Sequence, residues 1–97
     1  MGKLEKDIQK KIIEYLKQIG AYVVKVSIAN RSGVPDLLVC YKGKFIGIEV
    51  KRPGELATKL QEHNIANIFV SGGSAIVARD VEDVKAFIEF RSGRLDA

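Results

Sequence analysis

The chain has 97 residues, 46% of them hydrophobic and 29% charged, with a net charge of +4 and one cysteine, Cys40. This composition is that of an ordinary globular domain and excludes a disordered tail, and the length allows one modest core in a single domain over residues 1–97. The apolar runs are too short to cross a bilayer, and the N-terminus does not resemble a signal peptide. One cysteine excludes an internal disulfide and a cysteine-rich zinc site.

The charge is unevenly spread along the chain. Residues 1–52 contain eleven Lys and Arg against five Asp and Glu, whereas residues 53–97 contain five against seven. A basic half favours a polyanionic partner such as nucleic acid. A lysine-rich helix that simply faces water is an equally good interpretation of the charge alone.

The first half of the chain predicts one helix and three strands. Apolar residues at helical spacing predict a helix over about residues 3–19, which Gly20 ends. Alternating, β-branched segments then predict three strands, over residues 21–28, 34–41 and 45–51. A tight turn over 42–44 joins the last two strands into a hairpin, which we expect to be antiparallel.

The second half adds a helix, a strand and a helix. The second helix runs from about residue 55 or 59 to 69, and a short apolar strand follows over 75–79. The last helix begins after Asp80, its expected N-cap, and frays near Gly93. The order α-β-β-β-α-β-α favours an α/β fold in which flanking helices cover a mixed β-sheet. Cys40 lies in an apolar strand of that sheet, where we expect it to be buried and inert.

The third strand carries an acid and a lysine on one face. Glu49 and Lys51 are two residues apart and therefore project from the same side, whereas Ile48 and Val50 point the other way into apolar packing. Charged side chains inside a hydrophobic strand are unusual. The pair is either chemically active or an exposed ion pair on a strand that faces solvent.

A second carboxylate begins the preceding strand. Asp36 comes directly before a very apolar run, and the hairpin places it opposite Glu49. Two carboxylates so close repel each other unless one takes up a proton or a cation lies between them. A hard divalent ion such as Mg²⁺ suits such a pair, because it binds a few carboxylates and keeps waters for a substrate phosphate. The alternative is that Asp36 only caps the turn over 33–35.

The first helix contributes a third acid. In a helical projection Glu5 falls inside the apolar stripe, whereas Asp7 and Glu14 fall on the wet side. A carboxylate that faces inward needs a cation or hydrogen-bond donors. The alternative for Glu5 is an acid in the first turn that the helix dipole favours.

These residues together resemble a known nuclease pattern. Asp36, separated by twelve residues from Glu49-Val50-Lys51, is similar to the Asp…(Asp/Glu)-x-Lys signature of the restriction-endonuclease-like, or PD-(D/E)XK, superfamily. Nearly the whole chain resembles the VRR-NUC family, the virus-type replication-repair nuclease domain, and we expect a standalone member of it. The matching blocks are Glu5 with Ile8-Gln9, Gly33-Val34-Pro35-Asp36, residues 45–54, Thr58-Lys59-Leu60-Gln61 and residues 77–84.

The resemblance implies a restriction-endonuclease-like fold and a phosphodiester hydrolase that depends on Mg²⁺ or Mn²⁺. It assigns Asp36, Glu49 and the backbone carbonyl of Val50 to the metal, with Glu5 helping directly or through water. It assigns Lys51 as the catalytic lysine. These roles suit the chemistry, because phosphodiester hydrolysis needs a nucleophilic water and relief of charge at the phosphate.

Gln61 has two interpretations. Family members carry a glutamine at the start of the second helix, which implies a place in the catalytic site. Thr58 and Gln61 also have the spacing of a capping box, in which the two side chains cap the start of a helix. Both interpretations stay open from the sequence.

The resemblance also implies a DNA substrate and a homodimer that cuts four-way (Holliday) junctions during DNA repair. Basic residues near the site should contact phosphates. Arg31 and Ser32 are the strongest candidates, and the others are Lys3, Lys6, Arg52 and Lys59. Two alternatives remain, namely a nicking or general endonuclease on other branched DNA and a non-catalytic DNA-binding module. We expect a protein without a membrane partner, in the cytoplasm of a bacterium or of a phage-infected cell.

Overall fold

The computed structural model describes residues 4–96, with side chains described as far as Phe90. The predicted order of elements is confirmed. The elements are α1 (Glu5–Gln18), β1 (Tyr22–Lys25), β2 (Leu37–Tyr41), β3 (Lys44–Val50), α2 (Lys59–Val70), β4 (Ser74–Ala78) and α3 (Val81–Asp96). None of the helices in this part of the chain is long and apolar enough to span a membrane.

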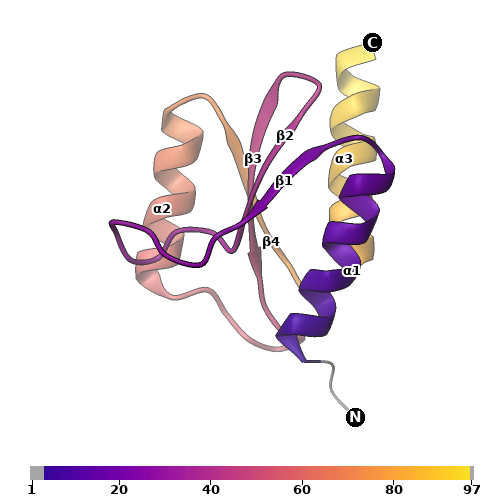
Figure 1. Ribbon diagram of the computed structural model, residues 1–97. Helices are drawn as coiled ribbons and strands as arrows, with labels where there is room; N and C mark the ends of the chain where they lie inside the picture. The colour runs from indigo at the N-terminus through magenta and orange to yellow at the C-terminus, as the bar shows by residue number, and fades with distance from the viewer. Residues whose placement is uncertain (1–3, 97) are drawn as a thin grey trace.

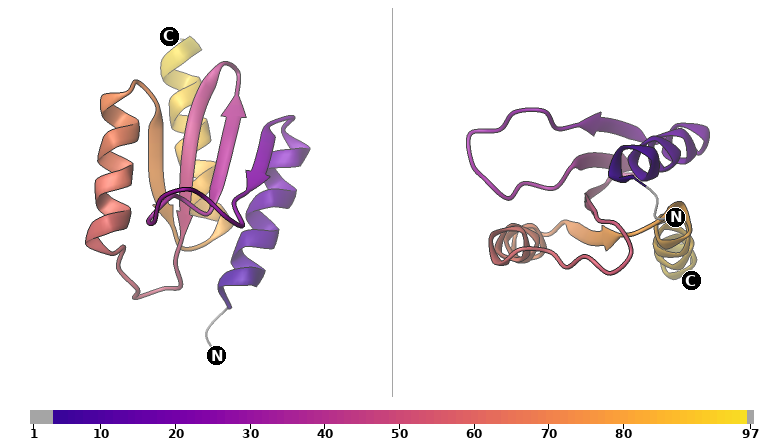
Figure 2. Two further views of the ribbon diagram at one scale, coloured as in Figure 1. Left: turned by 60° about the vertical axis from the view of Figure 1, so that its left-hand side comes forward. Right: turned by 90° about the horizontal axis from the view of Figure 1, so that it is seen from below.

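The four strands form one mixed sheet in the order β1-β2-β3-β4. β1 pairs with β2 and β2 with β3 in antiparallel fashion, so the predicted hairpin is confirmed, and β3 pairs with β4 in parallel. The helices cover the sheet on both faces. Figures 1 and 2 show α1 and α3 together on one face and α2 alone on the other.

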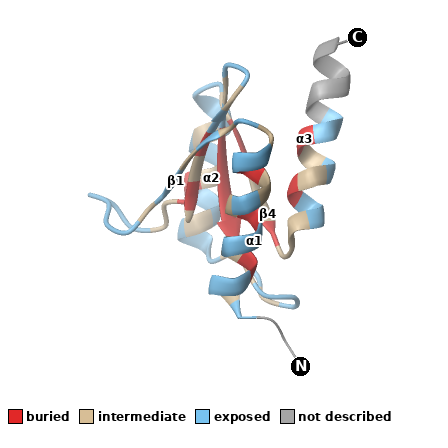
Figure 3. Cartoon of the chain, turned by 45° about the vertical axis from the view of Figure 1, so that its right-hand side comes forward, coloured by how far each residue is buried: buried red, intermediate tan, exposed pale blue. Residues whose placement is uncertain are grey.

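The core lies between the sheet and the pair α1 and α3. Because side chains alternate along a strand, one face of β2 and β3 supplies a continuous apolar surface. It packs against the apolar stripes of the two helices, which Figure 3 shows as the red inner sides. The buried residues are Ile8, Ile12 and Leu16 of α1, Leu37 and Val39 of β2, Ile46, Ile48 and Val50 of β3, Ala78 of β4, and Val84 and Ile88 of α3. The opposite face of β3 is therefore the one that carries Glu49.

Some predicted boundaries are wrong. β1 ends at Lys25 rather than residue 28, and β2 begins at Leu37 rather than residue 34. The chain between them is a long loop, because Pro35 has no N–H for a strand ladder and residues 33–35 turn toward α2. α3 does not fray near Gly93 but continues to Asp96. Its predicted cap is confirmed, since the N–H of Asp83 donates to Oδ1 of Asp80 at 2.9 Å.

Cys40 is exposed, so the prediction that it is buried is wrong. Val39 points into the core, and alternation turns Cys40 to the face that α2 covers. However, α2 packs against β3 and β4 and does not reach β2. Cys40 therefore belongs to an apolar run but lies on a part of the sheet that no described helix covers.

Candidate functional site

Asp36 and Glu49 lie opposite each other where β2 begins and β3 ends. The register pairs Leu37 with Ile48, and one further step places Asp36 beside Glu49, as the sequence predicts. Asp36 is held by its backbone as well as its side chain. Its carbonyl accepts a hydrogen bond from the N–H of Val26 at 2.9 Å, and its Oδ2 accepts one from the N–H of Val50 at 2.8 Å. Asp36 therefore does more than cap the turn over 33–35.

Glu49 is a buried carboxylate with only one of its two oxygens satisfied. Its side chain is 3% exposed. Oε2 accepts a hydrogen bond from Nε2 of Gln61 at 3.1 Å, whereas Oε1 is buried without a hydrogen-bond partner among the described residues. A buried unsatisfied carboxylate oxygen is costly, which makes it a strong candidate for binding a cation or a proton.

Burial is the main reason that the pKa of Glu49 rises from 4.5 to about 8. The negative charge of Asp36, and the hydrogen bond that protonated Glu49 makes with it, raise this pKa further, and Glu5 adds a smaller repulsion. The positive charge of Lys51 acts in the opposite direction. The predicted acid–acid repulsion at this hairpin is thus present, with one amine beside it.

Gln61 forms the predicted capping box and also contacts Glu49. Its Oε1 accepts a hydrogen bond from the N–H of Thr58 at 2.8 Å, and its own N–H donates to Oγ1 of Thr58 at 3.1 Å. These two bonds are the predicted capping box. The remaining amide nitrogen donates to Glu49. The cap of α2 therefore also orients a carboxylate of the site.

Glu5 reaches this site only at a distance. It is the first residue of α1 and is half-buried, and α1 packs on the opposite face of the sheet from α2. Among residues 4–90, whose side chains the structure describes, no three His, Cys, Asp or Glu side chains form a cluster that could hold a metal ion between them. The expected cage of three acids is therefore a pair, Asp36 and Glu49, with Glu5 acting on Glu49 through space.

The donor set of this pair fits a hard divalent cation. Asp36 and Glu49 come from neighbouring strands, and the buried Oε1 of Glu49 has a free lone pair. Mg²⁺ and Mn²⁺ prefer carboxylate and carbonyl oxygens and keep several waters, so two carboxylates and a backbone carbonyl are a sufficient protein contribution.

The loop before Asp36 is anchored to α2 by two residues that sequence reasoning missed. Gly33 has φ +80°, and a Cβ there would lie 2.8 Å from Cγ of Leu60. Nδ2 of Asn64 donates to the carbonyls of Ser32 at 3.1 Å and Leu60 at 2.9 Å. The signal for Asn64 was its position three residues after Gln61, which places both on one side of α2.

The segment after Lys51 is also fixed by contacts that the sequence did not reveal. The N–H of Lys51 donates to the carbonyl of Ala78 at 3.0 Å, which extends the pairing of β3 with β4. Arg79 then donates from its guanidinium to the carbonyl of Glu55 at 2.6 Å. Since β4 runs parallel to β3, the residues that follow the two strands lie at the same end of the sheet. The position of Arg79 directly after β4 was therefore the sequence signal for this contact.

The predicted DNA contacts that the structure describes are all exposed. Arg31 and Ser32 lie in the loop that leads to Asp36, and the carbonyl of Ser32 is bonded to Asn64. Arg52 forms an ion pair with Glu55 at 3.6 Å, so its charge is partly compensated. Lys6 and Lys59 are exposed at the starts of α1 and α2, and Lys3 lies outside the described residues.

The sheet order, the covering helices and the acidic pair beside a lysine define a restriction-endonuclease-like fold. Two solved VRR-NUC domains have this fold. The first is 30% identical with a TM-score of 0.77, and the match covers 88% of this chain and 94% of that domain. The second is 22% identical with a TM-score of 0.74, and the match covers 92% of this chain and 88% of that domain. Hjc of Archaeoglobus fulgidus, a Holliday junction resolvase, shares the fold with a TM-score of 0.60 and 22% identity, over 75% of this chain and 65% of Hjc.

A sequence relative supports the same assignment. The "Putative nuclease p44" of Acyrthosiphon pisum secondary endosymbiont phage 1 is 35% identical over 85 residues, which cover 87% of this chain and 90% of the phage protein. No family model matches the chain. On the strength of the relative and the similar structures, the chain belongs to the VRR-NUC family.

Proposed function

We propose that this protein is a Mg²⁺- or Mn²⁺-dependent DNA endonuclease that hydrolyses phosphodiester bonds at four-way junctions as a homodimer. The observation that carries the proposal is the buried Glu49, which has an unsatisfied oxygen, Oε1, and lies beside Asp36 and Lys51 at a strand end. The nuclease name of the phage relative and the fold shared with a Holliday junction resolvase support the reaction and the substrate class.

In this mechanism Asp36, Glu49 and the carbonyl of Val50 would hold the metal ion. The ion would supply charge neutralisation at the phosphate and a bound water of lowered pKa. Glu49 must lose its proton first, because its raised pKa leaves much of it protonated near pH 7. Gln61 keeps Oε2 of Glu49 oriented through its hydrogen bond, which leaves Oε1 available.

Lys51 supplies the positive charge that the chain itself brings to the reaction. It follows Glu49 by two residues, directly after β3, and its backbone N–H is fixed by the carbonyl of Ala78. From there its ammonium donates a hydrogen bond that orients the attacking water and balances the negative charge that develops on the phosphate, while the proton of the water leaves to solvent. Glu5 stays at a distance and contributes through the electrostatic field.

Exposed cations around the site bind the DNA backbone. Arg31 approaches from the loop before Asp36, Lys6 from the start of α1, Arg52 from the segment between β3 and α2, and Lys59 from the first turn of α2. The contacts of Lys6, Arg52 and Lys59 are to phosphates and position the duplex arms without reading their sequence. Ser32, next to Arg31, adds a hydroxyl that can donate to a phosphate oxygen.

Apolar surface along α2 supports the homodimer. A hollow of about 790 Å³ follows the outer side of α2 and the edge strand β4. It contains Leu56, Ile65, Phe69 and Val77, and Leu56 is 80% exposed. Such a patch, next to an open strand edge, fits a two-fold contact with a second copy, which brings two sites to two strands of a junction.

Cleavage of labelled DNA tests this function. Four-way, flap and linear duplex substrates are incubated with wild-type protein and Lys51→Ala, each with Mg²⁺, with Mn²⁺ and with EDTA. We expect metal-dependent cutting of the four-way junction, with a loss of about 100-fold or more in Lys51→Ala while junction binding persists. Wild-type-rate cutting by Lys51→Ala rejects the assigned role, and junction binding without any cutting by the wild type indicates a non-catalytic DNA-binding module.

A further inference from the structure

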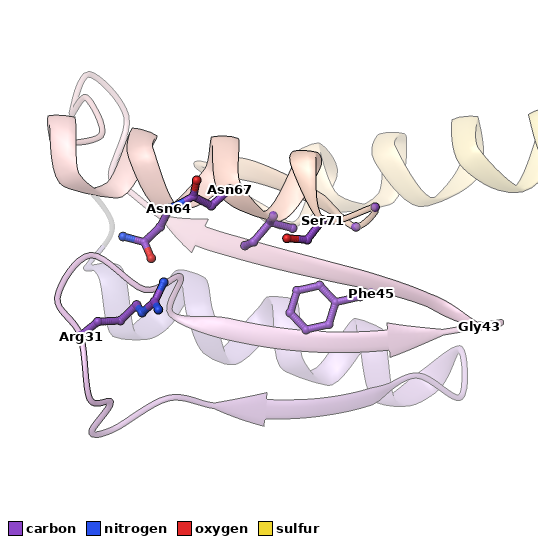
Figure 4. A pocket seen from close by; sticks show the side chains of 9 residues that line it. Arg31, Gly43, Phe45, Asn64, Asn67 and Ser71 are labelled. Carbon is purple, nitrogen blue, oxygen red and sulfur yellow. The ribbon is translucent and has the colours of Figure 1, made fainter.

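A second hollow lies on the Glu49 face of the sheet. It has a volume of about 490 Å³, within the range of small-molecule sites, and it opens between α2, the start of β3 and the loop at Arg31. Figure 4 shows Phe45 at one end of it, and Arg31 and Asn64 at the other. None of these three side chains belongs to the acidic pair.

The apolar end of the hollow presents an aromatic face. Phe45 is 45% exposed although the rest of β3 after it is buried. Its ring is held against Gly73, where a Cβ would come within 3.0 Å of Cδ1 of Phe45 and 2.9 Å of Cγ2 of Ile68. The glycine therefore makes room for the ring. A ring that is packed on one side and open on the other is a stacking platform.

The polar end holds a hydrogen-bond acceptor in a fixed orientation. Asn64 is 7% exposed, and its Nδ2 donates to two carbonyls, those of Ser32 and Leu60, so the amide can point only one way. Among the described residues no group donates to its Oδ1. Figure 4 shows the guanidinium of Arg31 extending toward this amide. A rigid acceptor and a cationic donor thus face the same space.

This hollow lies on the same face of the sheet as the candidate active site. Asn64 follows Gln61 by three residues on α2, which is one helical turn from the side chain that bonds Glu49. Phe45 precedes Glu49 by four residues on the same face of β3, about 13 Å along the strand. A DNA strand that crosses Glu49 would reach the hollow within one or two nucleotides.

We propose that this hollow binds one unpaired nucleobase of the DNA strand, stacked on Phe45 and hydrogen-bonded to Oδ1 of Asn64 and to Arg31. A nucleobase offers a flat aromatic face together with donors and acceptors on its edge, which matches the two ends of the hollow. A base inside a duplex cannot enter, so the subsite selects DNA in which a base is free to unstack, as at a branch point. Its position beside the scissile phosphodiester rests on the proposed function.

Titration of the ¹⁵N-labelled protein in EDTA with a single-stranded trideoxynucleotide tests this subsite without metal or cleavage. The probe has a central cytosine, and its control has an abasic centre. We expect amide shifts at Phe45, Gly73 and the side chain of Asn64 with the first probe, and weaker binding of the second. Phe45→Ala should weaken binding about fivefold or more, and Phe45→Tyr should restore it. Tyr22→Ala removes an exposed aromatic ring on β1 and should change nothing.

Three results would overturn the subsite: equal binding of the abasic probe, shifts confined to other residues, or unchanged affinity in Phe45→Ala. If Phe45→Ala does not give a folded spectrum, Phe45→Leu, which keeps an apolar side chain without an aromatic ring, replaces it, and unchanged affinity there counts against the proposal. A failed titration rejects the subsite but does not bear on the proposed nuclease function. If the protein binds the probe here but cuts no DNA, the subsite is supported and the nuclease function is rejected.

Discussion

Among single residues, Glu49 is the one whose negative charge is least favourably placed. Its carboxylate is buried, faces another carboxylate and has one oxygen without a hydrogen bond. Lys51 offsets part of this cost, and a proton or a divalent ion can offset the rest. The two occupants compete, so metal binding must release the proton and should strengthen as the pH rises.

The raised pKa of Glu49 predicts how the stability of the metal-free protein depends on pH. The pKa is about 8 in the folded protein, above the ordinary value of 4.5, so folding takes up a proton between these values. The resulting stabilisation is complete below pH 4.5 and is lost as the pH rises through about 8. In EDTA, the urea midpoint of the wild type should therefore fall from about pH 5 to pH 8 relative to that of Glu49→Gln, which cannot titrate. If the urea midpoint of the wild type instead rose relative to that of Glu49→Gln over this pH range, the pKa of Glu49 would not be raised.

Gln61 allows capping to be separated from orientation of Glu49. Thr58→Ala removes only the cap and should cost about 1 kcal/mol of stability with little change in cleavage. Gln61→Ala removes the side-chain half of the capping box, the bond from the N–H of Thr58, and also the hydrogen bond to Glu49, so DNA cleavage should fall about 10- to 100-fold at no greater loss of stability. Urea unfolding and junction cleavage of both variants make the comparison. Equal cleavage by the two variants would limit Gln61 to capping.

At the scale of elements, the loop between β1 and β2 sets the position of Asp36 by packing on α2. Gly33→Ala should disturb this packing, because its Cβ would meet Leu60 at 2.8 Å and Asn64 at 2.9 Å. Gly20→Ala is a matched control, since Gly20 also has a positive φ, +85°, but has nothing within 4 Å of a Cβ. The control should cost about 1–2 kcal/mol of stability and leave cleavage intact.

Gly33→Ala should lose more stability than this control and should lower junction cleavage about 100-fold, because a shift of about 1 Å in Asp36 misplaces a ligand. Circular dichroism melting and cleavage assays measure both effects. Cleavage at the rate of Gly20→Ala would mean that the packing of this loop does not position Asp36.

The sequence predicted the elements and the acidic pair because both depend on local patterns. Alternation along β3 placed Glu49 opposite the core, and the hairpin register placed Asp36 beside it. The burial of Cys40 was misjudged because it depends on which helix covers which face, and that depends on the whole chain. The double hydrogen bonding of Gln61 and the amide of Asn64 likewise require α2 to be placed in space.

At the scale of the whole molecule, the apolar surface of α2 predicts a dimer. Sedimentation at micromolar concentration should give a dimer for the wild type and a monomer for Phe69→Glu, which places a charge in the hollow along β4. Tyr22→Glu changes an exposed aromatic residue on β1 and should stay dimeric. The monomeric variant should nick junctions on one strand rather than make paired cuts. A wild type that sediments as a monomer removes the basis for paired incision.

The position of a bound ion tests the central claim most directly. Crystals of the wild type soaked in Mn²⁺ allow the metal to be located by its anomalous scattering. We predict a peak within coordinating distance of carboxylate oxygens of both Asp36 and Glu49, including Oε1 of Glu49, and no such peak in Glu49→Gln. Saturating Mn²⁺ without a peak between these two carboxylates would contradict the account.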